Sequence, residues 1–295
     1  RANHGQFNTV WGAYDHGEPT RHLLAVGSLL PAEDQRRVAQ VAITAGLEAS
    51  LLDRRAYGAF FRDPRRGAAW LPKVLLQSQY EDTSFRPLAT FEEDLDPTTG
   101  TLPGVRLEGE GLTVWKERHV KGRGGSYSFR QKGLWLGWDR EHRPNPSFTL
   151  TLPDGWTPEG DRLVLTLADT DDSPAPDPDP KAEGAGKAAA SKPESPTPGP
   201  KAPVDFTLEL TAADGTRAEL PLSAFRPLQP VLKVRLSKWD AFENAVYKAA
   251  WEPVFQTFEV PLERFGLGSR PQSLRLRFDR TPKGVILLGP LGTAR

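Results

Sequence analysis

Two different hydrophobic patterns divide the chain near residue 85. Before that point, apolar residues recur every three or four positions, as on one face of an α-helix. The clearest such stripe consists of Val38, Val41, Ala42, Ala45, Ala49 and Leu52. A proline and two acids stand at its start, where a helix tolerates proline and its dipole favours negative charge. The pattern predicts a helical segment over residues 1–84, with a long helix near 32–55 and a short one over 70–82.

From residue 85 onward, short segments alternate apolar and polar residues. Examples are GLTVWKERHV, SFTLTL, RLVLTLADT and SLRLRFDRT, and Gly, Pro and Asp separate them. Such alternation places one face of each strand in a core and the other in water. Asp214-Gly215, between two of these segments, is typical of a tight hairpin turn. We predict a mainly β fold, with an antiparallel β-sandwich of jelly-roll type over residues 85–295.

One stretch inside the β-rich region has a different composition. Residues 173–203 contain no Leu, Ile, Val, Phe, Trp or Tyr. Such a segment buries too little apolar surface to offset the entropy of ordering it, so we predict disorder. Similar alternating segments flank it, and extra loop length adds little closure entropy. We therefore interpret it as a loop inserted within one sandwich, with an interdomain linker as the alternative.

Composition narrows the classes of partner. The chain carries 38 Lys and Arg against 38 Asp and Glu, whereas nucleic-acid-binding proteins usually present a basic face. It contains no cysteine, which excludes disulfides, thiolate metal sites and a cysteine nucleophile. No apolar run approaches the roughly 20 residues of a membrane-spanning helix. We expect no nucleic-acid partner and no membrane span.

The sequence offers little for ion binding. None of the five histidines forms an H-x-x-x-H pair, so we predict no zinc site. The acidic run Glu92, Glu93, Asp94 and Asp96 has the oxygen ligands that Ca²⁺ prefers. A solvated loop is the favoured interpretation of that run. We expect no metal and no cofactor.

Two tryptophans in GLWLGW are candidates for stacking on a sugar ring. Alternation along a strand puts Leu134, Leu136 and Trp138 on one face and Trp135 on the other. At least one of the two indoles should therefore lie outside the main core or under a covering loop. Trp135 and Trp138 are therefore candidates for contact with a ligand, and packing in the core is the favoured interpretation of both.

The start of the chain carries a short motif around a histidine. Ala2, Asn3 and His4 are followed by a glycine, by Phe7 and then by the predicted long helix. This arrangement resembles the histidine loop of the α/β-hydrolase fold, as in esterases and in dienelactone-hydrolase-like and polyester-hydrolase-like enzymes. The resemblance covers about the first 60 residues. It implies that His4 takes the proton of a serine nucleophile and that Asn3, Phe7 and Trp11 lie at the rim of a substrate pocket.

A second resemblance concerns the end of the chain. The stretch LRLRFDRTPKGVILLGPLG is similar to the last strands of galactose-binding-like jelly rolls. Together the two resemblances imply the C-terminal end of an α/β-hydrolase domain over residues 1–84, followed by an accessory sandwich over 85–295.

The hydrolase motif is incomplete in this sequence. Triad order in that fold is Ser, then Asp or Glu, then His, yet no G-x-S-x-G occurs in the 295 residues. We therefore expect the nucleophile, the acid and the oxyanion-hole amides to lie upstream of Arg1, and the chain alone to be inactive.

The predicted function of the intact protein is serine-dependent hydrolysis of a small carboxylic ester or related acyl bond. The alternative is a non-catalytic sandwich that binds carbohydrate or a protein, or one that only stabilises a catalytic core. The family resemblance and the composition of residues 173–203 favour an extracellular or cell-envelope location.

Overall fold

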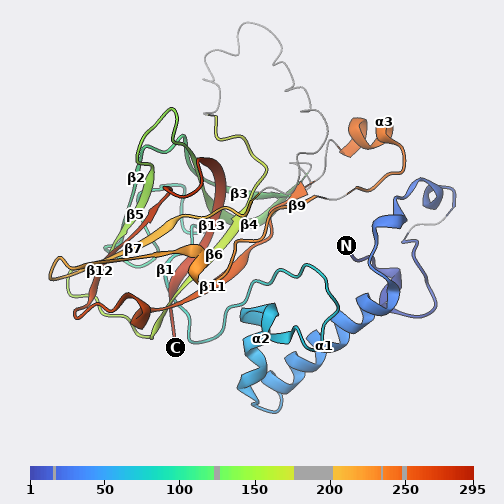
Figure 1. Cartoon of the computed structure of the whole chain (residues 1–295), viewed down its shortest axis with the longest axis horizontal. Helices are drawn as coiled ribbons and strands as arrows, with labels where there is room; N and C mark the ends of the chain where they lie inside the picture. The colour runs from blue at the N-terminus through green and yellow to red at the C-terminus, as the bar shows by residue number, and fades with distance from the viewer. Residues whose placement is uncertain (16–17, 123–126, 176–201, 234, 248–250) are drawn as a thin grey trace, which may run out of the picture.

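The computed structural model describes residues 1–15, 18–122, 127–175, 202–233, 235–247 and 251–295 (Figure 1). Two antiparallel β-sheets pack face to face, and a helical segment lies beside one end of them. The mainly β fold and the antiparallel sandwich that the sequence predicts are thus confirmed. None of the helices within these ranges combines the length and the apolar character needed to cross a bilayer.

The helical segment, residues 1–84, contains two α-helices and several single turns. The predicted long helix is α1 (Ala32–Ser50), and a short α2 (Gly58–Arg62) follows it. Turns of 3-10 helix are η1 (Gly5–Phe7), η2 (Thr20–Leu23), η3 (Val26–Ser28), η4 (Arg55–Tyr57) and η5 (Pro64–Gly67).

The short helix predicted over residues 70–82 is wrong. That stretch is extended and runs along an edge of the sandwich, where Ser78 O accepts the Thr257 N–H at 3.1 Å. The Thr257 hydroxyl oxygen in turn accepts the Tyr80 N–H at 2.8 Å. Pairing with an otherwise open strand edge satisfies backbone groups that a helix would have satisfied internally.

The larger sheet has the strand order β11-β6-β13-β4-β3, with β1 beside the end of β13. Its strands are β1 (Arg86–Ala89), β3 (Val114–Gly122), β4 (Tyr127–Asp139), β6 (Arg162–Asp169), β11 (Gln256–Pro261) and β13 (Lys283–Ala294). The smaller sheet has the order β2-β5-β12-β7-β8. Its strands are β2 (Arg106–Glu110), β5 (Ser147–Thr151), β7 (Thr207–Ala212), β8 (Arg217–Pro221) and β12 (Pro271–Arg277).

The connections carry a few further elements. Single 3-10 turns η8 (Leu222–Ala224) and η10 (Leu262–Phe265) follow β8 and β11. A two-stranded ribbon of β9 (Leu232–Lys233) and β10 (Trp251–Glu252) encloses α3 (Asp240–Phe242) and the π-turn η9 (Glu243–Tyr247).

Two details of the sandwich test sequence predictions. The Asp214-Gly215 hairpin joins β7 to β8, and Gly215 has the positive φ of 83° that such a turn needs. Residues 176–201, most of the segment predicted as disordered, lie outside the described residues. The strands on either side of that segment, β6 and β7, belong to the two sheets of one sandwich.

The core follows the predicted alternation along β4. Leu134, Leu136 and Trp138 point between the two sheets, in the main hydrophobic cluster. Trp135 points the other way and belongs to a second cluster on the outer face of the larger sheet, with Val114, Val120, Ala168, Phe255, Val285 and Leu287. Trp251 of β10, more than a hundred positions from β4 in sequence, packs against this second cluster.

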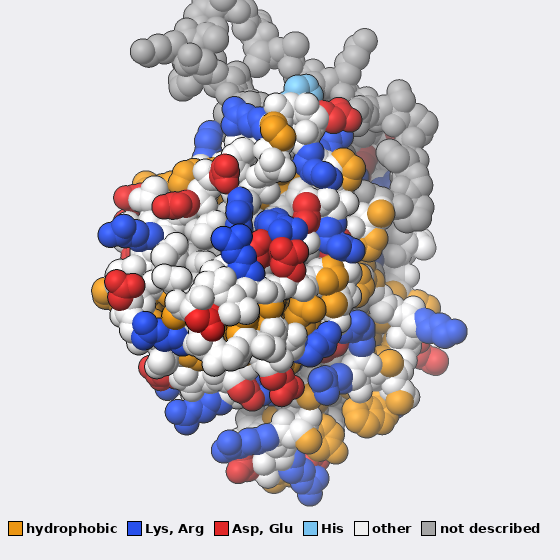
Figure 2. Space-filling view, turned by 60° about the vertical axis from the view of Figure 1, so that its left-hand side comes forward, with side chains coloured by type: hydrophobic (Ala, Val, Ile, Leu, Met, Phe, Trp, Pro, Cys, Tyr) orange, Lys and Arg blue, Asp and Glu red, His pale blue; other side chains and the backbone are white. Residues whose placement is uncertain are grey.

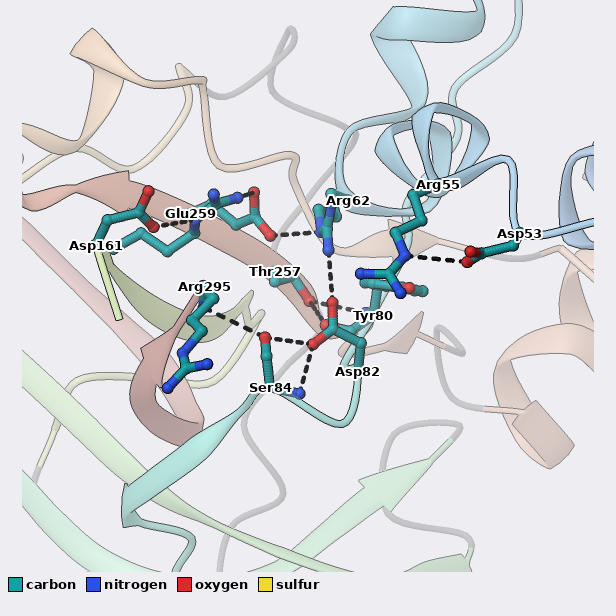
Figure 3. A network of polar contacts seen from close by, with 11 residues as sticks. Asp53, Arg55, Arg62, Tyr80, Asp82, Ser84, Asp161, Thr257, Glu259 and Arg295 are labelled. Carbon is teal, nitrogen blue, oxygen red and sulfur yellow. Dashed lines mark hydrogen bonds and ion pairs between the residues drawn. The ribbon is translucent and has the colours of Figure 1, made fainter. Parts of the chain in front are cut away.

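A network of ion pairs lies where the helical segment meets the sandwich, and its Arg62–Glu259 pair joins the two (Figure 3). Arg62 of α2 lies between two carboxylates, with Nη2 at 2.5 Å from Asp82 Oδ2 and Nε at 2.7 Å from Glu259 Oε1. Glu259 of β11 also pairs with Arg162 of β6, at 3.1 Å, and Arg162 pairs with Asp161 at 2.9 Å. The side chain of Arg62 is only 23% exposed, so the attachment is partly shielded from water and from screening.

Candidate functional site

Asp15 holds the backbone around His4. Its Oδ2 accepts the His4 N–H at 2.9 Å, and its Oδ1 accepts the Gly5 N–H at 2.7 Å and the Asn3 side-chain amide at 3.0 Å. Partial desolvation raises the pKa of the Asp15 carboxyl, but these hydrogen bonds outweigh it and hold the pKa below its ordinary value. The carboxylate therefore fixes the loop rather than contacting the imidazole.

Gln35 anchors the same loop to α1. Its Oε1 accepts the Asn3 N–H at 3.1 Å, and its Nε2 donates to the Asn3 carbonyl at 2.5 Å. The side chain is 1% exposed, so both bonds are made away from water, where leaving them unmade is costly. Like a backbone peptide group, the Gln35 amide both accepts from and donates to the backbone of Asn3. This pair of hydrogen bonds fixes the position and the direction of the chain before His4.

Gly5 is required by a close approach. It is buried, and a Cβ at this position would lie 2.5 Å from the Gly12 carbonyl oxygen. A larger residue would push the two arms of the loop apart and break the bonds to Asp15. The glycine after the histidine therefore allows the tight packing of this loop, which we call the His4 loop (residues 1–15).

The His4 side chain itself is exposed. Its ring meets the Trp11 indole edge to face, with centroids 5.5 Å apart and planes at 78°. Trp11 and Phe7 are 63% and 50% exposed. The structure thus brings Asn3, His4 and Trp11 together in one loop, with Phe7 in the turn that follows. In the described part of the chain, no side chain hydrogen bonds to the His4 imidazole.

Two residues of this arrangement escaped the sequence analysis. Asp15 looks like an ordinary loop acid in the sequence, because the hydrogen bonds it accepts come from residues about ten positions away. Gln35 could have been identified from the sequence. It lies three positions before Val38 and is therefore a polar residue on the apolar face of α1. A buried polar side chain on an apolar face needs a partner, and here the partner is the backbone of Asn3.

The sugar-stacking prediction for Trp135 and Trp138 is not supported, because both side chains are 0% exposed. The Trp138 ring stacks on Phe278 at 4.3 Å between centroids, and its Nε1 donates to the Thr281 carbonyl at 2.9 Å. Trp135 lies beneath Arg118, whose guanidinium carbon is 3.9 Å from the indole centroid. Packing explains both tryptophans, and neither presents a face to a ligand.

The acidic run packs over β3 and β4. Glu92 Oε1 accepts the Lys132 N–H at 2.7 Å, and Lys132 Nζ donates to the Asp94 carbonyl at 3.0 Å. Desolvation and the nearby carboxylates of Asp94 and Glu93 raise the pKa of Glu117 to about 7. Within the described ranges, no group of three or more His, Asp or Glu side chains is arranged to hold a metal ion.

The outward face of the smaller sheet is polar. Arg275 pairs with Glu110 at 3.0 Å, and Arg277 pairs with Glu219 at 2.6 Å and with Glu209 at 3.1 Å. Figure 2, which turns the β2-β5-β12 side forward, shows basic and acidic side chains mixed across it. This face offers hydrogen-bonding groups from four strands, β2, β12, β7 and β8.

Comparisons with known proteins give weak likenesses. No family model matches the chain, and no curated protein matches it. Among solved structures, an exo-beta-agarase has a TM-score of 0.34 and 11% identity, over 70% of this chain and 24% of that one. The chain thus spans about a quarter of the agarase.

Two shorter solved structures are matched over nearly their whole length. The K1 cleaved adhesin domain of Lys-gingipain from Porphyromonas gingivalis has a TM-score of 0.33 and 12% identity, over 68% of this chain and 93% of that one. A family 11 carbohydrate-binding module of a Clostridium thermocellum cellulosomal cellulase has a TM-score of 0.33 and 9% identity, over 73% and 97%. Likenesses at this level carry no functional information for the chain.

Proposed function

We propose that the helical segment is the histidine-bearing end of a serine hydrolase that acts on a carboxylic ester or related acyl bond. The observation that carries the proposal is the His4 loop, whose backbone is fixed by Asp15 and Gln35 while the imidazole stays exposed. A general base must be held in place and yet reach the substrate. On this proposal, His4 takes the proton of the nucleophilic serine and then gives it to the leaving group.

The helical segment also presents apolar surface without a partner. Of its described residues, only Ala45, Phe60 and Pro64 are buried apolar side chains. Along one side of α1, Ile43, Leu47 and Leu51 are 62%, 51% and 73% exposed. Exposed apolar residues spaced four apart on a helix favour packing against another surface.

A partner that packs on this exposed apolar surface would complete the proposed site. We place the serine, the acid and the oxyanion-hole amides in a folded body outside Arg1–Arg295 that packs on the exposed side of α1 and beside the His4 loop. Val10 and Trp11, at 84% and 63% exposure, add two exposed apolar side chains in that loop. The sandwich is then an accessory unit, attached in part through the ion pair of Arg62 with Glu259.

The test is hydrolysis of a chromogenic ester such as p-nitrophenyl butyrate. The native polypeptide that contains this chain should turn the ester over, because it supplies the nucleophile. The isolated chain Arg1–Arg295 should release nitrophenol no faster than buffer does, because His4 alone has no serine to activate. Turnover by the isolated chain, or none by the native polypeptide, would count against the proposal.

A second candidate is glycan recognition by the sandwich, favoured by the polar outward face of the smaller sheet. Arg275 and Arg277 there offer planar, charged donors suited to hydroxyl groups. The test is retardation of the chain in gels that contain soluble glycans. A glycan that retards the wild type but not Arg275→Ala supports this candidate. The matched control is Arg54→Ala, an arginine of the helical segment that also pairs with one glutamate. If no glycan retards the chain, or if both variants behave alike, the candidate fails.

A further inference from the structure

A cavity of about 770 Å³ lies where the helical segment meets the sandwich. Its walls come from α2 and η5 on one side and from η8, η10, the start of β6 and most of β11 on the other. Six arginines and four carboxylates line it, which leaves an excess of two positive charges. No residue of the His4 loop belongs to it, so the cavity is separate from the proposed catalytic site.

Three of the six arginines are neutralised by carboxylates of the same cavity. Arg65 pairs with Asp63 at 2.6 Å. Arg62 and Arg162 share Glu259, at 2.7 and 3.1 Å, as part of the network in Figure 3. The Arg62–Glu259 pair joins the two walls of the cavity, and three arginines remain without a carboxylate partner among the described residues.

Arg226 is the least compensated of the remaining three. One of its terminal nitrogens donates to the Thr257 carbonyl, and its guanidinium carbon lies 4.4 Å from the centroid of the Phe258 ring. Its Nε is buried without a hydrogen-bond partner, and no carboxylate of the described residues lies within ion-pair distance. Desolvation lowers the pKa of Arg226 to about 10. The side chain is half-buried, and the carboxylates of Asp63 and Glu259 act on it only from beyond ion-pair distance, so a counter-charge in contact with it would stabilise it.

Arg66 and Arg264 line the same cavity and are exposed. Neither forms an ion pair with a described residue, although Arg264 lies 5.2 Å from the Phe225 ring centroid. Arginine presents several N–H donors in one plane, which matches the oxygens of a phosphoryl group. The two excess positive charges of the cavity lining balance a phosphate dianion better than they balance the single negative charge of a carboxylate ligand.

We propose that this cavity binds a phosphoryl group, as inorganic phosphate or as a small phosphate monoester, between Arg226, Arg66 and Arg264. The anion would take the place of water at Arg226. It would also bridge the two parts of the chain, because Arg66 belongs to the helical segment whereas Arg226 and Arg264 belong to the sandwich. Binding should therefore also stabilise the attachment of the helical segment.

Isothermal titration calorimetry of the whole chain with inorganic phosphate, and separately with glycerol 3-phosphate, tests this proposal. We expect saturable binding of at least one of the two at constant ionic strength, and the tighter one identifies the source of the phosphoryl group. Arg66→Ala should weaken anion binding about tenfold, because it removes a charge-assisted hydrogen bond. Arg226→Lys should weaken it by a similar factor, because lysine keeps the charge but lacks the forked donor geometry of a guanidinium. Arg217→Ala, an exposed arginine on β8 outside the cavity, should bind like the wild type.

Two results would overturn the proposal. One is the absence of saturable heat with both anions. The other is binding that Arg66→Ala leaves unchanged. Arg66 is exposed, so Arg66→Ala should fold normally and decides the outcome even if Arg226→Lys does not fold.

Discussion

Replacement of Trp138 by alanine should lower the free energy of unfolding of the chain by about 3–5 kcal/mol. The side chain is 0% exposed and lies between the two sheets, stacked on Phe278. Its removal leaves a large cavity and also leaves the Thr281 carbonyl without its donor. Denaturant unfolding followed by far-UV circular dichroism measures the loss.

Two further variants separate packing from hydrogen bonding. Trp138→Phe keeps a ring against Phe278 and should lose about 1–3 kcal/mol. Trp239→Ala removes an indole that is 64% exposed and should change stability by less than about 0.5 kcal/mol. A loss below about 1 kcal/mol for Trp138→Ala would show that the indole is not a core residue and would reopen a ligand-stacking role.

Replacement of His4 by glutamine in the native polypeptide should lower kcat/KM for ester hydrolysis by at least about a thousandfold, or about 4 kcal/mol of transition-state stabilisation. Glutamine has a similar size and also forms hydrogen bonds, but it does not accept and return a proton. On the proposed role of His4, KM should change little, since a general base acts on the reaction rather than on binding. Steady-state kinetics with p-nitrophenyl butyrate give both constants.

The matched control is His142→Gln. His142 is 76% exposed, lies on the sandwich and pairs with Asp139 at 3.0 Å. This variant should keep the wild-type kcat/KM. A His4→Gln enzyme that retains more than about a tenth of the activity would remove His4 from the chemistry.

The sequence predicted those parts of the fold that depend on local patterns. Alternation along β4 correctly separated Leu136 and Trp138 from Trp135, because side-chain direction in a strand has a fixed period of two. The Asp214-Gly215 turn and α1 were predictable for the same reason. Each is decided by residues within a few positions of one another.

The errors concern contacts between distant segments. Trp135 was a candidate for facing a ligand, yet it is buried beneath Arg118 in a cluster that includes Phe255 and Leu287. Residues 70–82 were expected to be helical, yet they pair with the edge of β11. In both places a partner more than a hundred positions away along the chain decides the outcome, and the spacing of apolar residues carries no information about it.

In the candidate site, too, the local motif was predictable from the sequence, whereas the contacts with more distant residues were not. His4 and its flanking glycine were identified from a short motif, whereas Asp15 and Gln35, which hold the loop, were not. All but one of their hydrogen bonds go to backbone groups of Asn3, His4 and Gly5, and any residue type has such groups. Only the folded chain shows that the loop is anchored from two sides.

The most direct test of the account is the rate at which a fluorophosphonate labels the native polypeptide, followed by intact mass and peptide mapping. We expect one phosphonyl adduct on a serine outside Arg1–Arg295, formed far more slowly in His4→Gln and at the wild-type rate in His142→Gln. The same labelling rate in all three proteins, or no adduct in any of them, would contradict the assignment of His4 as the base of a serine hydrolase.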